Sequence, residues 1–394
     1  MKILAIHNFH RKGSASGDDQ VFKSETAMLE AHGNQVVRYS VINDSFDAQG
    51  IFGKLRSAFG MLWSFENYKN VRELIEAEKP DIVHIHTFFP LLSPSVLYAA
   101  QRSGCKVVAT LHDTRFVCPC ATSLRGTTLC NACGDGNYFR MCKYGCFKGS
   151  RLQSLVVACI FTFHRLCRSF YKQIDRYIFL NENQIRLLKE IGFDPKKIIK
   201  KYNFVPDVTA AEQDHPDLPE RYAVFYGRIG EEKGIRVLEK IWEQLPDIPL
   251  VVMGGGPLEQ EFSQWAQQHS QVHYLGYTPH DKCLSIVKGG EFVVFPSIWY
   301  EGCSMVQIET ESLGKALVAT DLGFSVEAIE NGVNGYKVPL NDVEGFVEKI
   351  RKLWQDPETC RRMGENARKD YLAKYTPEDN YAQLLRIYRE LSTE

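Results

Sequence analysis

The chain has 394 residues, 44% of them hydrophobic and 24% charged, which is the length and composition expected of a globular protein with two domains. With a formal net charge of −1, the protein lacks the positive electrostatic field that is typical of nucleic-acid-binding proteins. The sequence contains no uncharged apolar run long enough to cross a membrane. Because the N-terminus is too polar after Ile6 for a secretion signal, we expect a cytosolic protein whose 12 cysteines are metal ligands or buried thiols and not disulfides.

The first part of the chain has the pattern of an α/β domain. Residues 2–6 predict a buried strand, a small-residue loop ending in Gly17 follows, and residues 19–31 predict a helix. Strand, glycine loop and helix form the opening of a dinucleotide-type unit. Further strands are predicted at 36–41, 82–86, 106–111 and 176–180, and a helix at 182–191.

A histidine follows one of these strands directly. The strand at 106–111 ends before His112, and a side chain at the carboxyl end of a strand faces the ligand crevice of a doubly wound sheet. His112 is therefore a candidate site residue. The alternative is a core histidine bonded to a backbone carbonyl.

Between Cys118 and Cys146 the regular pattern stops. Cys130-x-x-Cys133 supplies one half of a four-thiolate zinc site, and Cys118 and Cys146 could supply the other half. Free, buried thiols are the alternative. Cys120 and Cys142 are additional cysteines of this cysteine-rich insert (residues 118–146).

The insert is followed by a stretch that is both apolar and basic. Eight Lys or Arg residues and a single acid, Asp175, occur from Arg140 to Arg176. Residues 154–170 predict a helix that is either buried with its charged ends extended to water or lies on an anionic membrane surface. Residues 51–63 are a second stretch of this kind, and the pair favours membrane docking.

A second α/β domain begins after a linker at 207–219. A strand at 222–226 precedes a glycine-containing turn with two cations, Arg228 and Lys233. Such a pair suits a diphosphate, with Arg228 as a bidentate fork and Lys233 as a point charge, although isolated residues of this kind are more often surface charges. Further strands are predicted at 250–253, 273–276, 291–295 and 317–320, and helices at 342–355, 357–374 and 377–391.

The segment from 295 to 309 has the pattern of an anion site. A strand at 291–295 is followed by a turn and then by a helix predicted at 303–313. The free N–H groups and positive dipole end of such a helix bind phosphate, here around Gly302, Cys303 and Ser304. Glu301 and Glu309 flank this helix start and could hold sugar and ribose hydroxyls. In the alternative interpretation Glu301 only complements the helix dipole.

These segments together resemble the family-four retaining glycosyltransferases of the GT-B fold over roughly residues 1–375. The resemblance rests on the Glu301 and Glu309 pair, the Gly-Arg and Glu-Lys-Gly fragments around 228 and 233, and the His-x-His segment at 84–86. It implies an α/β fold with two doubly wound Rossmann-like domains facing each other across a cleft. The implied domains are 1–206 with the insert 118–146 on the acceptor side, 207–375 for the nucleotide-sugar, and 376–394 as a helix crossing back to the first domain.

The resemblance also implies roles for the candidate residues. Glu301 would position the donor sugar, Glu309 the ribose, and His112 the sugar from the first domain. The sequence has no Asp-x-Asp motif, so no catalytic divalent metal is expected, and charge on the departing diphosphate would be stabilised by Arg228 and Lys233 with the helix start. Two departures from the family pattern matter. Relatives have a Gly-Gly pair in the loop after the first strand, where only Gly17 fits a donor contact here. Relatives also have Gly-Gly where this chain has Gly323-Phe324, and we expect the phenylalanine to narrow the pocket.

The implied activity is retaining, metal-independent transfer of a hexosyl unit from a UDP- or GDP-sugar. A subset of bacterial surface-polysaccharide transferases (capsule or O-antigen, that is, lipopolysaccharide) is similar in its cysteines, which suggests a lipid-linked oligosaccharide acceptor, a structural zinc, and a cytoplasmic enzyme peripheral on the inner face of the cytoplasmic membrane. A sugar-nucleotide epimerase or hydrolase of the same fold and a non-catalytic scaffold subunit remain alternatives. The epimerase or hydrolase would turn over without acceptor.

Overall fold

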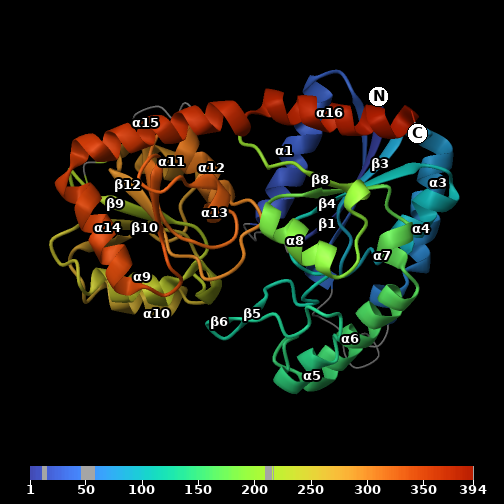
Figure 1. Ribbon diagram of the computed structural model, residues 1–394, viewed down its shortest axis with the longest axis horizontal. Helices are drawn as coiled ribbons and strands as arrows, with labels where there is room; N and C mark the ends of the chain where they lie inside the picture. Colours follow the sequence, from blue (N-terminus) through green and yellow to red (C-terminus); the bar gives the residue numbers. More distant parts are fainter. Residues whose placement is uncertain (11–15, 46–57, 209–214, 216, 394) are drawn as a thin grey trace. The chain divides into compact units, whose positions relative to one another are not determined.

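The computed structural model describes residues 1–10, 16–45, 58–208, 215 and 217–393. The chain forms two compact units (Figure 1). Unit 1 comprises Met1–Ser123, Cys130–Tyr202 and Asn380–Glu394, and unit 2 comprises Leu124–Leu129 and Asn203–Asp379. The sequence placed the boundaries after residues 206 and 375 and assigned the whole insert to the first domain.

Unit 1 is built on a six-stranded parallel sheet with the strand order β2-β1-β3-β4-β7-β8. The order reverses between β1 and β3, so the carboxyl ends of these two strands mark the switch point at which such sheets bind ligands. The strands are β1 (Lys2–Phe9), β2 (Gln35–Ile42), β3 (Ile82–Thr87), β4 (Lys106–Leu111), β7 (Arg176–Phe179) and β8 (Ile198–Lys200).

The helices of unit 1 include the segment that carries the basic apolar residues. The described ones are α1 (Gly17–Ala31), α3 (Phe65–Glu78), α4 (Ser95–Arg102), α5 (Arg140–Tyr144), α6 (Arg151–Leu166), α7 (Ser169–Lys172), α8 (Glu182–Glu190) and most of α16 (Pro377–Thr393). The single helix predicted at 154–170 is two helices, because Arg168 has a left-handed backbone conformation with φ 53°.

Unit 2 is a second six-stranded parallel sheet with the order β11-β10-β9-β12-β13-β14, the doubly wound order of dinucleotide-binding domains. Its switch point lies between β9 and β12. The strands are β9 (Ala223–Tyr226), β10 (Leu250–Met253), β11 (Val272–Tyr274), β12 (Phe292–Phe295), β13 (Ala316–Thr320) and β14 (Gly335–Val338), and a small hairpin joins β5 (Leu124–Arg125) to β6 (Thr128–Leu129).

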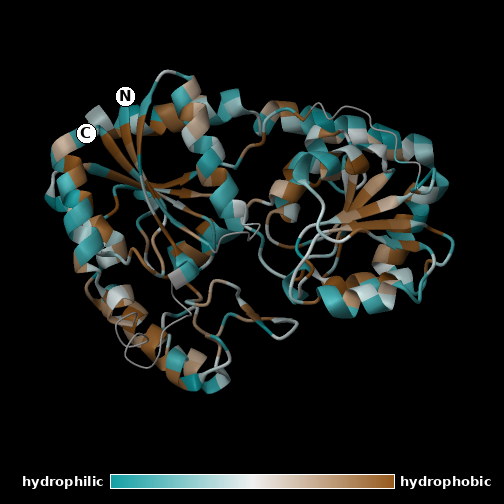
Figure 2. Ribbon diagram, turned by 180° about the vertical axis from the view of Figure 1, so that it is seen from behind, coloured by the Kyte–Doolittle hydropathy of each residue, from teal (hydrophilic) through white to brown (hydrophobic). Residues whose placement is uncertain are grey.

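The helices of unit 2 connect these strands. They are η3 (Glu231–Lys233), α9 (Ile235–Trp242), α10 (Glu259–Ala266), α11 (His280–Gly289), α12 (Met305–Ser312), α13 (Ser325–Ala328), α14 (Val343–Gln355) and α15 (Pro357–Lys374). The central strands are buried on both faces, which explains their nearly continuous apolar sequences. Figure 2 shows the strands of both sheets in mostly hydrophobic colours.

The predicted fold class is confirmed: both sheets are doubly wound and Rossmann-like. The strands predicted at 106–111 and 250–253 and the helix at 357–374 have the observed bounds. Besides the split of the helix predicted at 154–170, the helix predicted from 303 differs, since it begins at Met305. The edge strand β14 (Gly335–Val338) was not predicted. None of the helices in the described residues combines the length and the apolar character that crossing a bilayer requires.

Candidate functional site

In unit 2 the turns after β9 and β12 lie against each other at the switch point. Gly234, in the first turn, has φ +74°, and a Cβ atom at this residue would lie 1.9 Å from the Pro296 carbonyl oxygen of the second turn. Only glycine satisfies both the left-handed conformation and this close approach. The contact brings the predicted residues Lys233 and Glu301 together.

Lys233 and Glu301 form an ion pair, with 2.6 Å between Nζ and Oε1. Ser297 Oγ donates a hydrogen bond of 3.0 Å to the same carboxylate oxygen. The ammonium group also lies 5.6 Å from the ring centre of Phe295 and 5.4 Å from that of Trp299. Because Glu301 is only 7% exposed, this pair is better shielded from water than a surface salt bridge and holds both side chains in place.

Arg228 lies in the same turn but is held much less tightly. Its side chain is 60% exposed, and its Nε is 3.6 Å from Glu232 Oε1. Exposed pairs of this kind contribute little to stability. The guanidinium group can therefore move toward a ligand at little cost in free energy.

The start of α12 presents backbone N–H groups at this position. Ser304 is its N-cap, and among the described residues the Ser304 side chain makes no capping hydrogen bond. Asn203 fixes the residue before it, since its side-chain amide donates to the Cys303 carbonyl at 3.1 Å and its backbone N–H lies 3.3 Å from the Cys303 sulfur. The turn into the helix is thus formed by Gly302, Cys303 and Ser304. The N–H groups in the first turn of a helix have no partner within the helix and can bind an anion.

Glu309, in the second turn of α12, is buried beside the end of β9. Burial raises the pKa of Glu309 to about 8, although a hydrogen bond from the Tyr226 hydroxyl opposes this. His280 Nε2 is 3.6 Å from Glu309 Oε1. A carboxyl with such a pKa changes its charge near neutral pH, a property typical of functional sites.

The predicted narrowing of the pocket by Phe324 is wrong. The Phe324 side chain is completely buried, and its ring centre lies 5.9 Å from that of Tyr375. Gly323 faces Glu301 instead, since a Cβ atom at Gly323 would lie 2.6 Å from the Glu301 backbone nitrogen. The Phe324 N–H donates to the Glu301 carbonyl at 3.1 Å, so this segment supports the Glu301 backbone.

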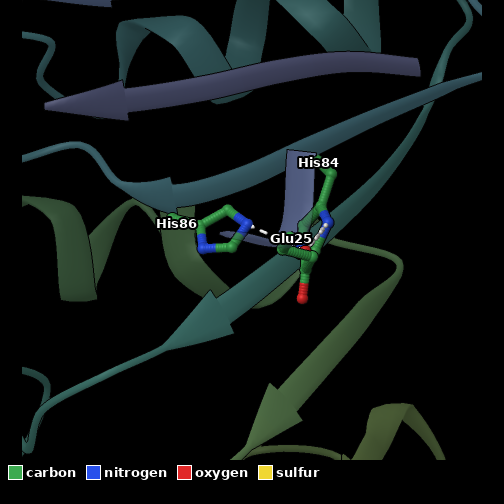
Figure 3. Close-up of side chains that lie close together, drawn as sticks. All are labelled: Glu25, His84 and His86. Carbon is green, nitrogen blue, oxygen red and sulfur yellow. Dashed lines mark hydrogen bonds and ion pairs between the residues drawn. The ribbon is translucent and has the colours of Figure 1, made fainter. Parts of the chain in front are cut away.

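In unit 1, His112 follows β4 and belongs to a network of buried polar side chains. Its Nε2 is 3.1 Å from Nδ1 of His86 at the end of β3, and His86 Nε2 is 3.1 Å from Oε1 of Glu25 on α1. His84 Nδ1 lies 3.2 Å from the same Glu25 oxygen. Figure 3 shows both histidines directed at this carboxylate. Lys201 Nζ is 3.0 Å from its other oxygen.

The charges of this network follow from its contacts. Burial alone would raise the pKa of Glu25, but the Lys201 ammonium group, followed by the neighbouring His86 and His84 rings, holds that pKa well below its usual value. Burial lowers the pKa of His86 to about 3 and that of His112 to about 4. Both rings are therefore neutral at pH 7.

The structure places two other predicted features in unit 1. Gly17 is the first residue of α1, and the rest of its predicted loop, 11–15, lies outside the described residues. Burial raises the pKa of the Cys133 thiol to about 12, and the neighbouring Cys118, Cys146 and Cys130 add to this rise. Among the described residues, the possible metal ligands that lie within 4.8 Å of one another belong to Glu25, His84 and His86 and not to the cysteines. The zinc site therefore stays a prediction.

Several residues of these sites were not predicted from the sequence. Ser297, Tyr226, Glu25 and Lys201 carry no motif of their own. Glu25 and Lys201 are 176 positions apart, so no local pattern relates them. The signals that pointed to the network were the His-x-His segment at 84–86 and the position of His112 after its strand.

Comparison with known proteins places this chain in a family. The model described as Glycosyltransferase Family 4 matches residues 28–207, and the model described as Glycosyl transferases group 1 matches residues 209–370. The chain belongs to glycosyltransferase family 4. Together with the two doubly wound sheets, this makes it a GT-B glycosyltransferase.

Relatives and solved structures agree with this assignment. The family-4 chain is 26% identical over 371 residues to an alpha-D-kanosaminyltransferase of Streptomyces kanamyceticus, covering 90% of this chain and 88% of the relative. It is 28% identical over 176 residues to O-antigen chain mannosyltransferase C of Escherichia coli, covering 44% of this chain and 47% of the relative.

Two solved structures are similar over nearly the whole chain. Sucrose-phosphate synthase of Thermosynechococcus elongatus has a TM-score of 0.72 at 17% identity and covers 99% of each chain. Anabaena HepE in complex with UDP has a TM-score of 0.69 at 16% identity and covers 99% of this chain and all of the other. At these identities the likeness establishes the fold.

Proposed function

We propose that this family-4 glycosyltransferase transfers a hexosyl unit, with retention and without a catalytic divalent metal, from a UDP- or GDP-sugar to a lipid-linked oligosaccharide. The observation that carries the proposal is the Lys233–Glu301 pair at the switch point of unit 2, beside the open start of α12. A cation, an acid and the N–H groups of a helix start thus occur after β9 and β12, where a doubly wound sheet binds a nucleotide.

Each part of the donor has a matching group in unit 2. Lys233, Arg228 and the N–H groups at the start of α12 suit the diphosphate, whose charge grows as the glycosidic bond breaks. Glu301 is positioned to accept hydrogen bonds from sugar hydroxyls, and Glu309 from the ribose. Binding of UDP by the structurally similar HepE supports a nucleotide donor of this class.

The reaction needs no covalent nucleophile in this arrangement. The acceptor hydroxyl attacks on the face from which the diphosphate leaves, and the departing phosphate oxygen takes the hydroxyl proton. His112 contributes from unit 1 by contacting the donor sugar. Positioning and electrostatic stabilisation then supply most of the catalysis.

The acceptor proposal rests on a second apolar face of α6. One face is buried, with Val157, Ile160 and Phe161 in the core. The opposite face is an exposed apolar stripe at helical spacing, with Leu152 73%, Phe163 49% and Leu166 79% exposed. Leu155 and Cys159 complete the stripe. A helix that is apolar on both faces needs an apolar neighbour on the outer one.

Basic residues flank this stripe, which favours an anionic membrane as the neighbour. Arg151 and Arg168 at its two ends are exposed, as is Lys148 before it. The second predicted stretch approaches the same helix, because His164 Nε2 donates to the Leu62 carbonyl at 2.9 Å. Phe59 is 70% exposed on that segment, whose residues 51–57 lie outside the described ones. We infer a peripheral enzyme on the cytoplasmic membrane that meets its lipid-linked acceptor there.

A structural zinc belongs to the same proposal. Cys118, Cys130, Cys133 and Cys146 all lie in unit 1, and the first two and Cys146 act electrostatically on Cys133. Four thiolates are the donor set of closed zinc sites. Such a site would order the insert. It would not take part in the reaction.

The direct test is a thermal-shift panel of UDP- and GDP-sugars, followed by transfer assays with lipid-linked acceptors and NMR of the product anomer. We expect one donor to stabilise the protein and the product to keep the donor's anomeric configuration. Turnover that does not require acceptor would instead establish the epimerase or hydrolase. An inverted product would overturn the retaining mechanism.

A further inference from the structure

A chain of hydrogen bonds inside unit 1 connects α1 to the candidate sugar-binding histidine. It runs from Glu25 Oε1 to His86 Nε2, and from His86 Nδ1 to His112 Nε2, with 3.1 Å at each link. The two imidazole rings are stacked, with centroids 5.3 Å apart and an angle of 22° between their planes. His86 therefore uses both of its ring nitrogens within the network, whereas His112 uses Nε2, and its Nδ1 lies on the other side of the ring.

The chemistry of the three groups gives this chain a single direction. An ionised carboxylate only accepts hydrogen bonds, so His86 Nε2 must carry a proton. His86 is neutral, which leaves its Nδ1 as a lone pair. That lone pair accepts from His112, so His112 Nε2 carries a proton and its Nδ1 is the acceptor atom.

The surroundings keep the direction fixed. Lys201 contacts the second oxygen of Glu25 at 3.0 Å and donates to the Asn380 side chain at 2.9 Å. The titratable groups that influence the pKa of His112 include Asp18, His7, Glu25 and Asp113, and His86 contacts the ring directly. Burial outweighs the acids among them, and both His86 and His112 remain neutral.

The same side chains do not suit a metal ion. Glu25, His84 and His86 have ligand atoms within 4.8 Å of one another, but the ammonium group of Lys201 already supplies a cation to this carboxylate. Both nitrogens of His84 are engaged, Nδ1 with the Tyr388 hydroxyl at 2.6 Å and Nε2 with the Thr110 hydroxyl at 2.8 Å. A buried carboxylate that is already paired in this way acts as a hydrogen-bonding anchor.

We propose that Glu25 is a positioning residue that acts through His86 to hold His112 as a neutral ring protonated on Nε2, with Nδ1 ready to accept a hydrogen bond from a hydroxyl of the donor sugar. The inference rests on the proposed function for the identity of the ligand. It goes beyond the contact between His112 and the sugar, because the tautomer of His112 is set by a carboxylate that never touches the substrate.

Glu25→Gln tests this tautomer directly. Lys201 can only donate, so the amide oxygen of the new side chain must face Lys201 and its NH2 group must face His86. His86 Nε2 then becomes the acceptor, and its Nδ1 becomes the donor to His112. The substitution keeps the shape of the side chain but reverses both histidine tautomers.

Nitrogen-15 NMR of the histidine rings reads these tautomers without an activity assay. In the wild-type protein we expect the His112 resonances of a neutral ring protonated on Nε2, and in Glu25→Gln those of a ring protonated on Nδ1. A wild-type His112 protonated on Nδ1, or a charged His112 at pH 7, would overturn the inference. Because the wild-type spectrum decides this, a variant that fails to fold leaves the test intact.

Kinetics then connects the tautomer to function. We expect Glu25→Gln to lower kcat by roughly 10- to 100-fold, the loss typical when the hydrogen-bonding carboxylate behind a functional histidine is changed. The KM for the donor should change less. The matched control is Tyr388→Phe, which removes the hydrogen bond between the Tyr388 hydroxyl and His84 and should leave kcat unchanged. Equal losses in both variants would indicate a purely structural role. If no nucleotide-sugar is turned over at all, the proposed function fails while the NMR result stands.

Discussion

At the scale of single residues, the structure changes how the Lys233 and Glu301 side chains are understood. The sequence suggested that they make two separate contacts with the ligand. In the structure they form an ion pair, with 2.6 Å between Lys233 Nζ and Glu301 Oε1. Each therefore neutralises the other before any donor binds. A donor must share or replace this contact, so its diphosphate and sugar are bound by a preorganised pair.

Removal of either charge should impair both reaction and stability. We expect Lys233→Ala and Glu301→Gln each to slow transfer by roughly two to three orders of magnitude. Lys233→Ala should also lower the midpoint of unfolding, because it removes the cation that is paired with the buried Glu301 carboxylate. Steady-state transfer rates and urea unfolding measure the two effects.

Arg351→Ala is the matched control for this pair. It breaks an exposed ion pair of unit 2, between Arg351 and Asp247 at 3.0 Å, and should change neither rate nor stability much. Transfer by Lys233→Ala at the rate of this control would remove Lys233 from the site.

The raised pKa of Glu309 predicts a dependence on pH. Its pKa of about 8 exceeds the value near 4.3 of an unfolded chain, so the folded state binds the extra proton between these two values. The contribution to stability is complete below pH 4.3 and is lost as pH rises through 8. Donor binding should change in the opposite direction, because the ionised carboxylate accepts ribose hydroxyls better.

Glu309→Gln should flatten both pH profiles, which calorimetry of UDP binding and urea unfolding between pH 6 and 8.5 will measure. His280→Gln is the control, since His280 Nε2 lies 3.6 Å from Glu309 Oε1. If the profiles flatten in His280→Gln and persist in Glu309→Gln, the histidine is the responsible group.

At the scale of elements, the parallel strands were predictable because strands buried on both faces have continuous apolar sequences. Gly335–Val338 escaped because a short edge strand that contains a glycine and a lysine has no such run. The start of α12 was displaced by two residues because Cys303 is held by a side chain from a distant segment, Asn203. The Glu25 network was unpredictable for the same reason: its members meet only in the folded sheet.

The α6 stripe leads to a prediction about membranes. We expect the protein to float with anionic vesicles at low salt and to be released at high salt, because each Lys or Arg near such a surface contributes on the order of 1 kcal/mol that salt screens. Leu155→Glu with Leu166→Glu should weaken flotation strongly. Arg165 is unsuited to this test, since its guanidinium group lies 5.9 Å from the ring centre of Tyr138 and against Gly136.

Leu372→Glu is the control for the stripe. Leu372 is 52% exposed on α15 of unit 2, and its substitution should leave flotation unchanged. Wild-type flotation that is absent at low salt, or equally weakened by both sets of substitutions, would remove the membrane from the proposal.

The cysteine-rich insert leads to a prediction about metal. Its few apolar residues cannot easily offset the entropy lost on ordering it, whereas a structural zinc site can contribute on the order of 10 kcal/mol in small modules. We expect one equivalent of zinc in protein purified without a polyhistidine tag. Cys133→Ser should lose this zinc and lower the melting temperature, while nucleotide affinity stays the same.

Cys142→Ser is the control for the insert, because Cys142 lies outside the predicted ligand set, and it should retain the metal. Zinc well below one equivalent in the wild type, with all thiols titratable in the native state, would identify the cysteines as packing.

At the scale of the whole molecule, the two units divide the proposed tasks. The residues assigned to the diphosphate and ribose lie in unit 2, whereas Gly17, assigned to a donor contact, and His112 with its network lie in unit 1. The net charge of −1 conceals a similar division, because the cations between Arg140 and Arg176 belong to unit 1. A nucleotide without its sugar should therefore interact with unit 2 alone.

Hydrogen exchange measured by mass spectrometry will test this division. We expect UDP or GDP, whichever binds, to slow exchange in the turn after β9 and in the first turn of α12, since ligand binding stabilises the state that it binds. Exchange in β1 and β3 of unit 1 should not change. Glu309→Gln should reduce the protection and Tyr388→Phe should not. Protection confined to unit 1 would place the nucleotide in the wrong unit and overturn the donor site, because none of the residues assigned to it could then contact the ligand.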